Sequence, residues 1–229
     1  MSGGILHPNR PESRPNRFFS EGESAAGPLV SAKAQEDCLT PAELSSWLDE
    51  QQEAMAARWL LEVQSRSEDI DGELLLLIGD FLHLLTSVLA PGLGAFREQV
   101  EAILQQAAEL YGNLGAHRGL AAGEAVEEVQ ILRRVLLRFL YTLLPGGGSA
   151  RVSLRDLLQL NRLIDLGVTY ASVGHTDTLF FNLFHGTGVS GTPTPELLAE
   201  VREQVAGAWD ELSLLTIREG KEAPGRLPQ

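Results

Sequence analysis

The chain has a single cysteine, Cys38, in 229 residues, so it cannot form an internal disulfide. Without a CxxC pair or a Cys/His cluster, the sequence also predicts no structural zinc site. Basic side chains are few: 18 Lys and Arg stand against 31 Asp and Glu, which gives a formal net charge of −13 at pH 7. Such a charge opposes attraction to nucleic-acid phosphates or anionic lipid. We therefore expect a cytoplasmic protein that binds no nucleic acid.

Long apolar runs are also missing. The first 19 residues lack the apolar stretch of a secretory signal, and the most apolar segment, residues 74–90, is interrupted by Gly79, Asp80 and His83. Strand signals are equally scarce, because the β-branched residues are dispersed and no Asn-Gly or Asp-Gly turn separates two alternating segments. The sequence therefore predicts a soluble, all-α protein with no membrane insertion.

Helical periodicity is what the sequence does contain. Apolar residues recur at spacings of three and four over six segments, at about residues 40–65, 68–89, 96–116, 123–144, 153–184 and 194–218. Leucines surround most of the second segment, which is typical of a buried helix. Six such helices need neighbours to bury their apolar faces. We predict one all-α domain of five to six long helices over residues 39–218, arranged as a bundle or in a globin-like way.

The two ends of the chain differ from this body. Residues 1–38 are rich in Pro, Ser, Gly and Arg without a sustained apolar period, and residues 219–229 contain Gly, Pro and Lys. Such compositions bury too little apolar surface to offset the entropy of ordering. Both segments are predicted to be disordered tails.

No catalytic constellation can be assembled from the sequence. The segment 188–191 lacks the spacing and the preceding strand of a nucleophile turn, and the glycines of 146–148 lack the Lys-Ser or Lys-Thr of a phosphate loop. Carboxylates fall at helical spacings that are typical of solvated faces. Arg134 and Arg138, four residues apart, require an acidic helix opposite them, in this chain or in a partner. We expect no enzyme, no catalytic residue and no metal site.

Two histidines, His175 and His83, could either bind a ligand or have a purely structural role. His175 prolongs an apolar stripe and precedes Phe180, Phe181 and Phe184, a combination that suits a pocket for haem, another tetrapyrrole or a small apolar ligand. A core histidine bonded to a carbonyl group would explain the same pattern. His83, three residues after Asp80, is a second candidate ligand, with a structural pair to that carboxylate as the alternative. Neither pattern requires a cofactor.

Residues 114–140, LGAHRGLAAGEAVEEVQILRRVLLRFL, carry a glycine, an arginine three residues on, a glycine that opens a helix, then Glu-Glu-Val and a Leu-Arg pair. With Trp59 in a preceding long helix, this stretch resembles the amino-terminal helical domain of RsbR-type co-antagonist proteins of bacterial stress signalling. The resemblance covers about residues 40–185. The matching positions are Gly115, Arg118, Gly123, Glu127, Glu128, Leu132 and Arg133.

The resemblance implies a bundle-like or globin-like sensory domain without obligatory haem, commonly a homodimer, with structural duties for its motif. Gly115 would leave a helix with a positive φ, Gly123 would open the next helix, and Arg118 would bond exposed carbonyl groups at the junction. The family usually continues into an output module, whereas only residues 219–229 follow the last predicted helix. We therefore expect a non-catalytic sensory or regulatory module that binds a protein partner or its own copy through helical faces, with the apolar seam of residues 198–215 as one such face.

Overall fold

The computed structural model describes residues 38–66, 70–141, 152–186 and 192–222, with side chains up to residue 218. Residues 1–37 and 223–229, which contain most of the two predicted tails, lie outside the described residues, as does the glycine-rich segment 146–148. Residues 219–222 belong to the last helix, so the predicted helix end at residue 218 was too early. The helix runs through Gly220, so this glycine does not end it.

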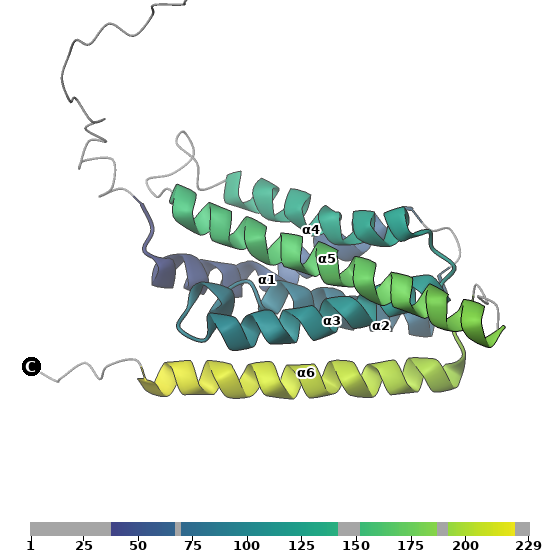
Figure 1. The fold of residues 1–229 in the computed structure, drawn as a ribbon. Helices are drawn as coiled ribbons and strands as arrows, with labels where there is room; N and C mark the ends of the chain where they lie inside the picture. Colours follow the sequence, from purple (N-terminus) through teal and green to yellow (C-terminus); the bar gives the residue numbers. More distant parts are fainter. Residues whose placement is uncertain (1–37, 67–69, 142–151, 187–191, 223–229) are drawn as a thin grey trace, which may run out of the picture.

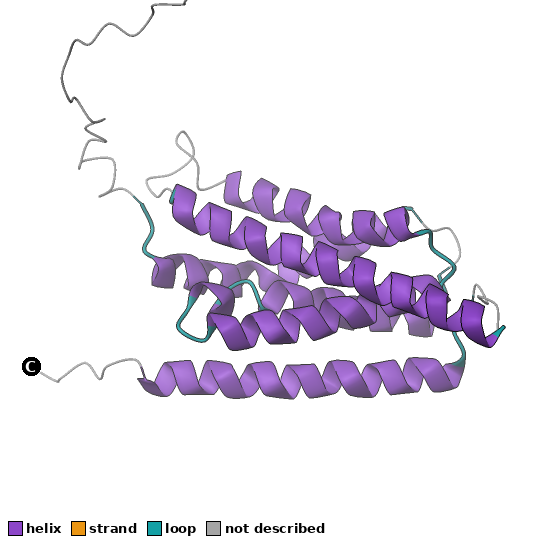
Figure 2. Cartoon of the chain, viewed as in Figure 1, coloured by secondary structure: helices purple, strands orange, loops and turns teal. Residues whose placement is uncertain are grey.

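The described chain is helical and contains no strand (Figure 2), which confirms the prediction of an all-α fold. The elements are α1 Pro41–Gln64, α2 Gly72–Ser87, the 3-10 helix η2 Pro91–Leu93, α3 Arg97–His117, α4 Ala122–Tyr141, α5 Leu154–His185 and α6 Pro195–Glu222. In Figure 1, α4 and α5 form one outer layer, α1, α2 and α3 lie in the middle, and α6 runs along the opposite face.

Two helix starts follow from their capping residues. At α1, the Thr40 hydroxyl accepts a hydrogen bond from the amide of Glu43, and the Glu43 carboxylate accepts one from the amide of Thr40 at 2.8 Å. At α5, the Ser153 hydroxyl accepts from the amide of Asp156 at 3.1 Å. These bonds satisfy amides that the helix cannot pair internally. The predicted starts of both helices are confirmed.

Helix α2 is strongly apolar and mostly buried in the core. Leu77, Ile78, Phe81 and Leu84 have no exposed surface, and only one side of the helix reaches solvent. The segment Gly72–Leu93 is long and apolar enough to cross a membrane, but 72% of its most apolar window is buried inside the bundle. A core helix of a soluble protein has this property.

The closest helix contact joins α3 and α5 through two glycines. A Cβ atom on Gly112 would lie 1.9 Å from the backbone carbonyl oxygen of Ala171, and one on Gly174 would lie 2.0 Å from that of Glu109. The two helix backbones therefore touch at this crossing, which leaves no room for any side chain. This contact fixes the position of the long helix α5 on the bundle.

The arginines of α4 find their expected acidic partner within the same chain. Arg138 Nη1 lies 2.7 Å from Glu62 Oε1 on α1, and Arg134 Nη2 lies 3.3 Å from Glu62 Oε2. The apolar seam of α6 is likewise satisfied internally, because Leu198, Val201, Val205 and Leu212 are buried where α6 packs on α2 and α3. The expectation that this seam serves a second chain is therefore corrected.

Candidate functional site

A buried ion pair ties α3 to α4. Arg118, the residue after α3, places Nη1 2.7 Å from Oε2 and Nη2 2.9 Å from Oε1 of Glu128, and both side chains are almost completely buried. The Tyr111 hydroxyl donates to Glu128 Oε2 at 2.7 Å. The indole Nε1 of Trp59, on α1, donates to the backbone carbonyl oxygen of Glu128 at 2.7 Å. Side chains from α1 and α3 thus converge on one residue of α4.

Tyr111 and Arg118 keep their protons near neutral pH. Burial raises the pKa of Tyr111 well above its ordinary value, and the nearby carboxylate of Glu128 raises it further. Burial alone would lower the pKa of Arg118, but the hydrogen bonds and negative charge of Glu128 outweigh it, so that the pKa is raised. Neither group can exchange a proton near pH 7, which favours a structural role over acid–base catalysis.

The raised pKa of Tyr111 predicts a specific loss of stability in alkali. A tyrosine of the unfolded chain ionises near pH 10, whereas the folded protein holds the Tyr111 proton to higher pH. Because the folded state then binds more protons, the free energy of unfolding is expected to decrease as the pH rises above about 10. Tyr111→Phe should reduce this decrease, as measured by urea unfolding at about pH 9 and pH 10.5. Identical pH dependences of the two proteins would show that Tyr111 ionises freely in the fold.

The RsbR-type motif residues take partly different roles from those expected. Gly115 lies inside α3, where an added Cβ would be 3.2 Å from the Cβ of Ala125, and the positive φ of 77° belongs to Gly119. Helix α4 begins at Ala122, directly before Gly123. Arg118 bonds the Glu128 carboxylate rather than exposed carbonyl groups. Helix α3 continues past Gly115, where it was expected to end, to His117, so the chain turns at Gly119 instead.

The other motif positions lie either on the exposed side of α4 or on its buried side. Leu132 is buried in the core. Glu127 accepts from Arg66 Nη1 at 2.9 Å, and Arg133 pairs with Asp165 of α5. Their contacts join α4 to the turn after α1 and to α5. Each motif residue with a described contact therefore helps to hold the helices together.

The structure places the two candidate histidines in separate surroundings. His175 is fully buried, and its Nε2 lies 2.8 Å from the backbone carbonyl oxygen of Leu120, as in the core-histidine alternative. The His83 ring packs on Trp209, with centroids 5.0 Å apart, and makes no hydrogen bond with Asp80 in the described contacts. His117, in the last turn of α3, lines a cavity described below.

The phenylalanines near His175 lie on the surface. The exposed fraction rises from 56% for Phe180 to 84% for Phe184, and Phe181 and Leu183 lie between these values. Helix α5 projects past the end of α4 in Figure 1, and in its last two turns only Thr178 and Asn182 are buried. We call Phe180, Phe181, Leu183 and Phe184 the apolar end of α5. A helix end with this composition is typical of an interaction surface.

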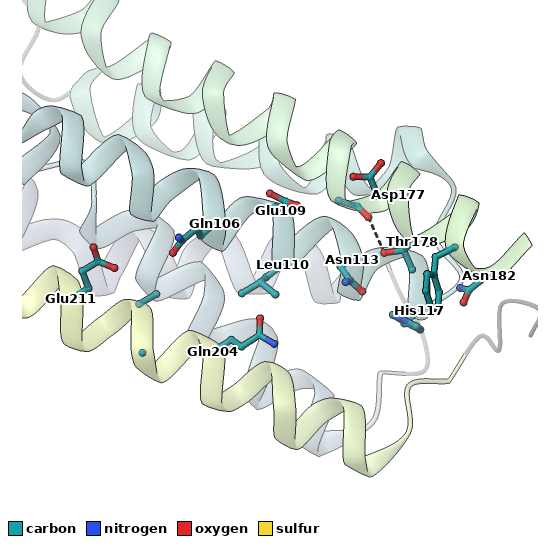
Figure 3. A pocket seen from close by; sticks show the side chains of 14 residues that line it. Gln106, Glu109, Leu110, Asn113, His117, Asp177, Thr178, Asn182, Gln204 and Glu211 are labelled. Carbon is teal, nitrogen blue, oxygen red and sulfur yellow. Dashed lines mark hydrogen bonds between the residues drawn. The ribbon is translucent and has the colours of Figure 1, made fainter. Parts of the chain in front are cut away.

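A cavity of about 870 Å³ lies between α3, α5 and α6 (Figure 3). Its apolar part includes Leu110, Ala208 and Phe181, and the last of these also belongs to the apolar end of α5. Its polar part holds three carboxylates, the side chains of Glu109, Asp177 and Glu211, together with Asn and Gln residues. Figure 3 shows Gln204 of α6 and Leu110 of α3 lying across this hollow from one another.

The charge of the cavity lining is negative. Among the described residues that line the cavity there is no Lys or Arg, and burial lowers the pKa of His117, which keeps that imidazole neutral at pH 7. An organic cation would suit such a lining better than the propionate groups of a tetrapyrrole. Within the described ranges no three His, Cys, Asp or Glu side chains are grouped so that they could hold a metal ion.

Sequence reasoning missed the buried carboxylates. The carboxylates as a group were expected on solvent faces, yet Glu128 is buried, as is Asp156 at the start of α5. For Glu128 a signal existed: it stands three residues before Ile131 and four before Leu132, in phase with the buried side of α4. A carboxylate on the buried side of a helix requires a positively charged partner, and Arg118 provides it.

Comparison of the chain with models of protein families, with curated proteins and with solved structures gives no match. The class defined by the observations above is an all-α bundle with a buried ion-pair cluster, an acidic cavity and an exposed apolar helix end.

Proposed function

We propose that this protein is a non-catalytic sensory or regulatory module that acts by binding another protein through the apolar end of α5. The resemblance of residues 114–140 to RsbR-type domains suggests a cytoplasmic role in bacterial stress signalling. The polar cluster around Glu128 supports a non-catalytic role, because its groups are paired with one another and the raised pKa values of Tyr111 and Arg118 keep those two groups protonated near neutral pH.

The exposure of the apolar end of α5 carries the proposal. Phe180, Leu183 and Phe184 stand at spacings of three and four, so they share one side of the helix. Helices that bind in grooves of other proteins use this spacing for their anchor residues. Burying one large apolar side chain contributes about 1.5–3 kcal/mol, against which the loss of freedom on association must be set, so these three residues would act as the anchors of a larger interface.

The charges at this end of the bundle indicate the chemistry of the partner. Asp177 lies one turn before the apolar end, and the first turns of α4 and α6, which lie at the same end in Figure 1, carry Glu124 and Glu196. A partner with an apolar cleft edged by Lys or Arg would match both features. A second copy of this chain would bring the same negative charges together, which makes it the less favourable occupant.

The double variant Phe180→Ser/Phe184→Ser tests the proposal. The wild-type chain is expected to retain a protein partner from the native host, and the purified partner is expected to bind it directly, with binding at least tenfold weaker for the double variant. Leu76→Ser is the matched control, because Leu76 is 69% exposed but lies on α2. Titration of the purified pair by calorimetry, with helix content checked by circular dichroism, measures the effect.

Three outcomes of this experiment would contradict the proposal. The first is a partner that binds the double variant as tightly as the wild type. The second is equal weakening by Leu76→Ser, which would show a general loss of apolar surface rather than a site. The third is a wild-type homodimer in light scattering that the double variant abolishes, which would assign the surface to self-association.

A further inference from the structure

A second surface lies at the other end of α5, where its first turns meet the last turns of α4. A groove of about 180 Å³ runs between the two helices, with Leu136, Leu137, Leu157, Leu158 and Ile164 along it and Arg133 and Asn161 at its edge. Most of its lining is aliphatic, so an aqueous ion would find few ligands there. The groove is suited to apolar side chains.

Large apolar residues continue the groove at the surface. Leu137 and Leu158 line it, and one turn further along their helices stand Tyr141 and Leu154. Their exposed fractions range from 47% for Leu137 to 73% for Tyr141. Two adjacent helices thus present a continuous apolar strip, which is the form of surface that accepts one side of an amphipathic helix.

Arginines border this strip on both sides. Arg134 and Arg138 lie on the side toward α1, and Arg155 and Arg162 lie on the flank of α5, where Arg162 reaches Glu101 of α3. The carboxylates that meet them are too few to cancel their charge. Glu62 is shared by Arg58, Arg134 and Arg138, Glu101 is shared by Arg97 and Arg162, and Arg155 has no ion pair in the described part. The strip is therefore basic, on a chain whose net charge is −13.

We infer that the groove between α4 and α5 binds an amphipathic helix of a partner protein whose apolar side is flanked by Asp and Glu. The helix would place apolar anchors against Leu137 and Leu158 and its carboxylates near the bordering arginines. This inference rests on the proposed function as a protein-binding module, but it concerns a surface at the opposite end of α5 from Phe180–Phe184. The two surfaces can fail independently.

A synthetic helix tests the inference. The probe is a fluorescein-labelled 21-residue peptide with Leu at spacings of three and four and Glu at its flanks, and its counterpart has Lys in place of Glu. In anisotropy titrations with the full chain, the Glu peptide is expected to bind at least tenfold more tightly than the Lys peptide. Its affinity should fall between 50 and 500 mM NaCl, because exposed charges are screened by salt.

Variants locate the binding. Leu137→Ser/Leu158→Ser is expected to weaken binding of the Glu peptide at least tenfold, and Arg155→Glu should weaken it severalfold and reduce its salt dependence. Leu61→Ser/Leu76→Ser is the control, since these exposed leucines belong to α1 and α2. Phe180→Ser/Phe184→Ser should leave peptide binding unchanged, which separates this test from that of the proposed function.

Several results would overturn the inference: no saturable binding of the Glu peptide, equal binding of the Lys peptide, or equal weakening by the control pair of leucines. A wild-type dimer that Leu137→Ser/Leu158→Ser converts to a monomer would also overturn it, because the groove would then be occupied by a second copy of the chain.

Discussion

Gly112→Ala is expected to lower the free energy of unfolding by about 3 kcal/mol, a large effect for the addition of one methyl group. The new Cβ would lie 1.9 Å from the backbone carbonyl oxygen of Ala171, so α3 and α5 would have to move apart. Their separation would loosen the side chains packed along the longest helix of the bundle. Urea unfolding followed by circular dichroism measures the change.

Gly207→Ala provides the matched control. Gly207 also lies inside a helix, α6, but an added Cβ there would meet no atom within 4 Å. Alanine loses less backbone entropy on folding than glycine, so this variant is expected to be more stable by about 0.5–1 kcal/mol. If Gly112→Ala were also neutral or stabilising, the direct backbone contact between α3 and α5 would be refuted.

Glu128→Ala is expected to destabilise the protein by about 3–5 kcal/mol, because it leaves the guanidinium of Arg118 buried without its counter-charge. The Tyr111 hydroxyl loses its acceptor in the same variant. Arg118→Ala should have an effect of similar size, since it leaves the carboxylate of Glu128 uncompensated. The free energies of unfolding of both variants can be measured at pH 7 by the same urea experiment.

Two comparisons test the cause of this loss. Arg66→Ala removes an exposed ion pair with Glu127, the neighbour of Glu128, and is expected to cost less than about 1 kcal/mol. The double variant Arg118→Met/Glu128→Leu should be more stable than either single alanine variant, since it leaves no unpaired charge. If Glu128→Ala cost no more than Arg66→Ala, the buried pair would not be formed in solution.

The helices could be predicted from the sequence because their signals are local. The capping residues of α1 and α5 and the apolar periods of all six segments act within a few turns of chain. The crossing of α3 and α5 could not be predicted in this way. Gly112 and Gly174 appear in the sequence only as weak helix formers, and their value depends on a neighbour about sixty residues away.

For the candidate site, too, the sequence predicts local features but not the contacts between distant helices. The sequence places His175 on an inward-facing apolar stripe, and the phenylalanines that follow it suggested that the same pocket continues along the helix. The structure buries His175, whereas the last turns of α5 run past the end of α4 and expose Phe180 and Phe184. Periodicity shows which side of a helix is apolar, but it does not show where the neighbouring helices end.

Hydrogen exchange of the full chain, alone and with its purified partner, tests the central claim most directly. Protection on binding is expected in residues 173–186, with unchanged exchange in residues 106–117, which face the acidic cavity. Protection confined to residues 106–117 and 204–211, with the end of α5 unaffected, would contradict the account and assign recognition to the cavity.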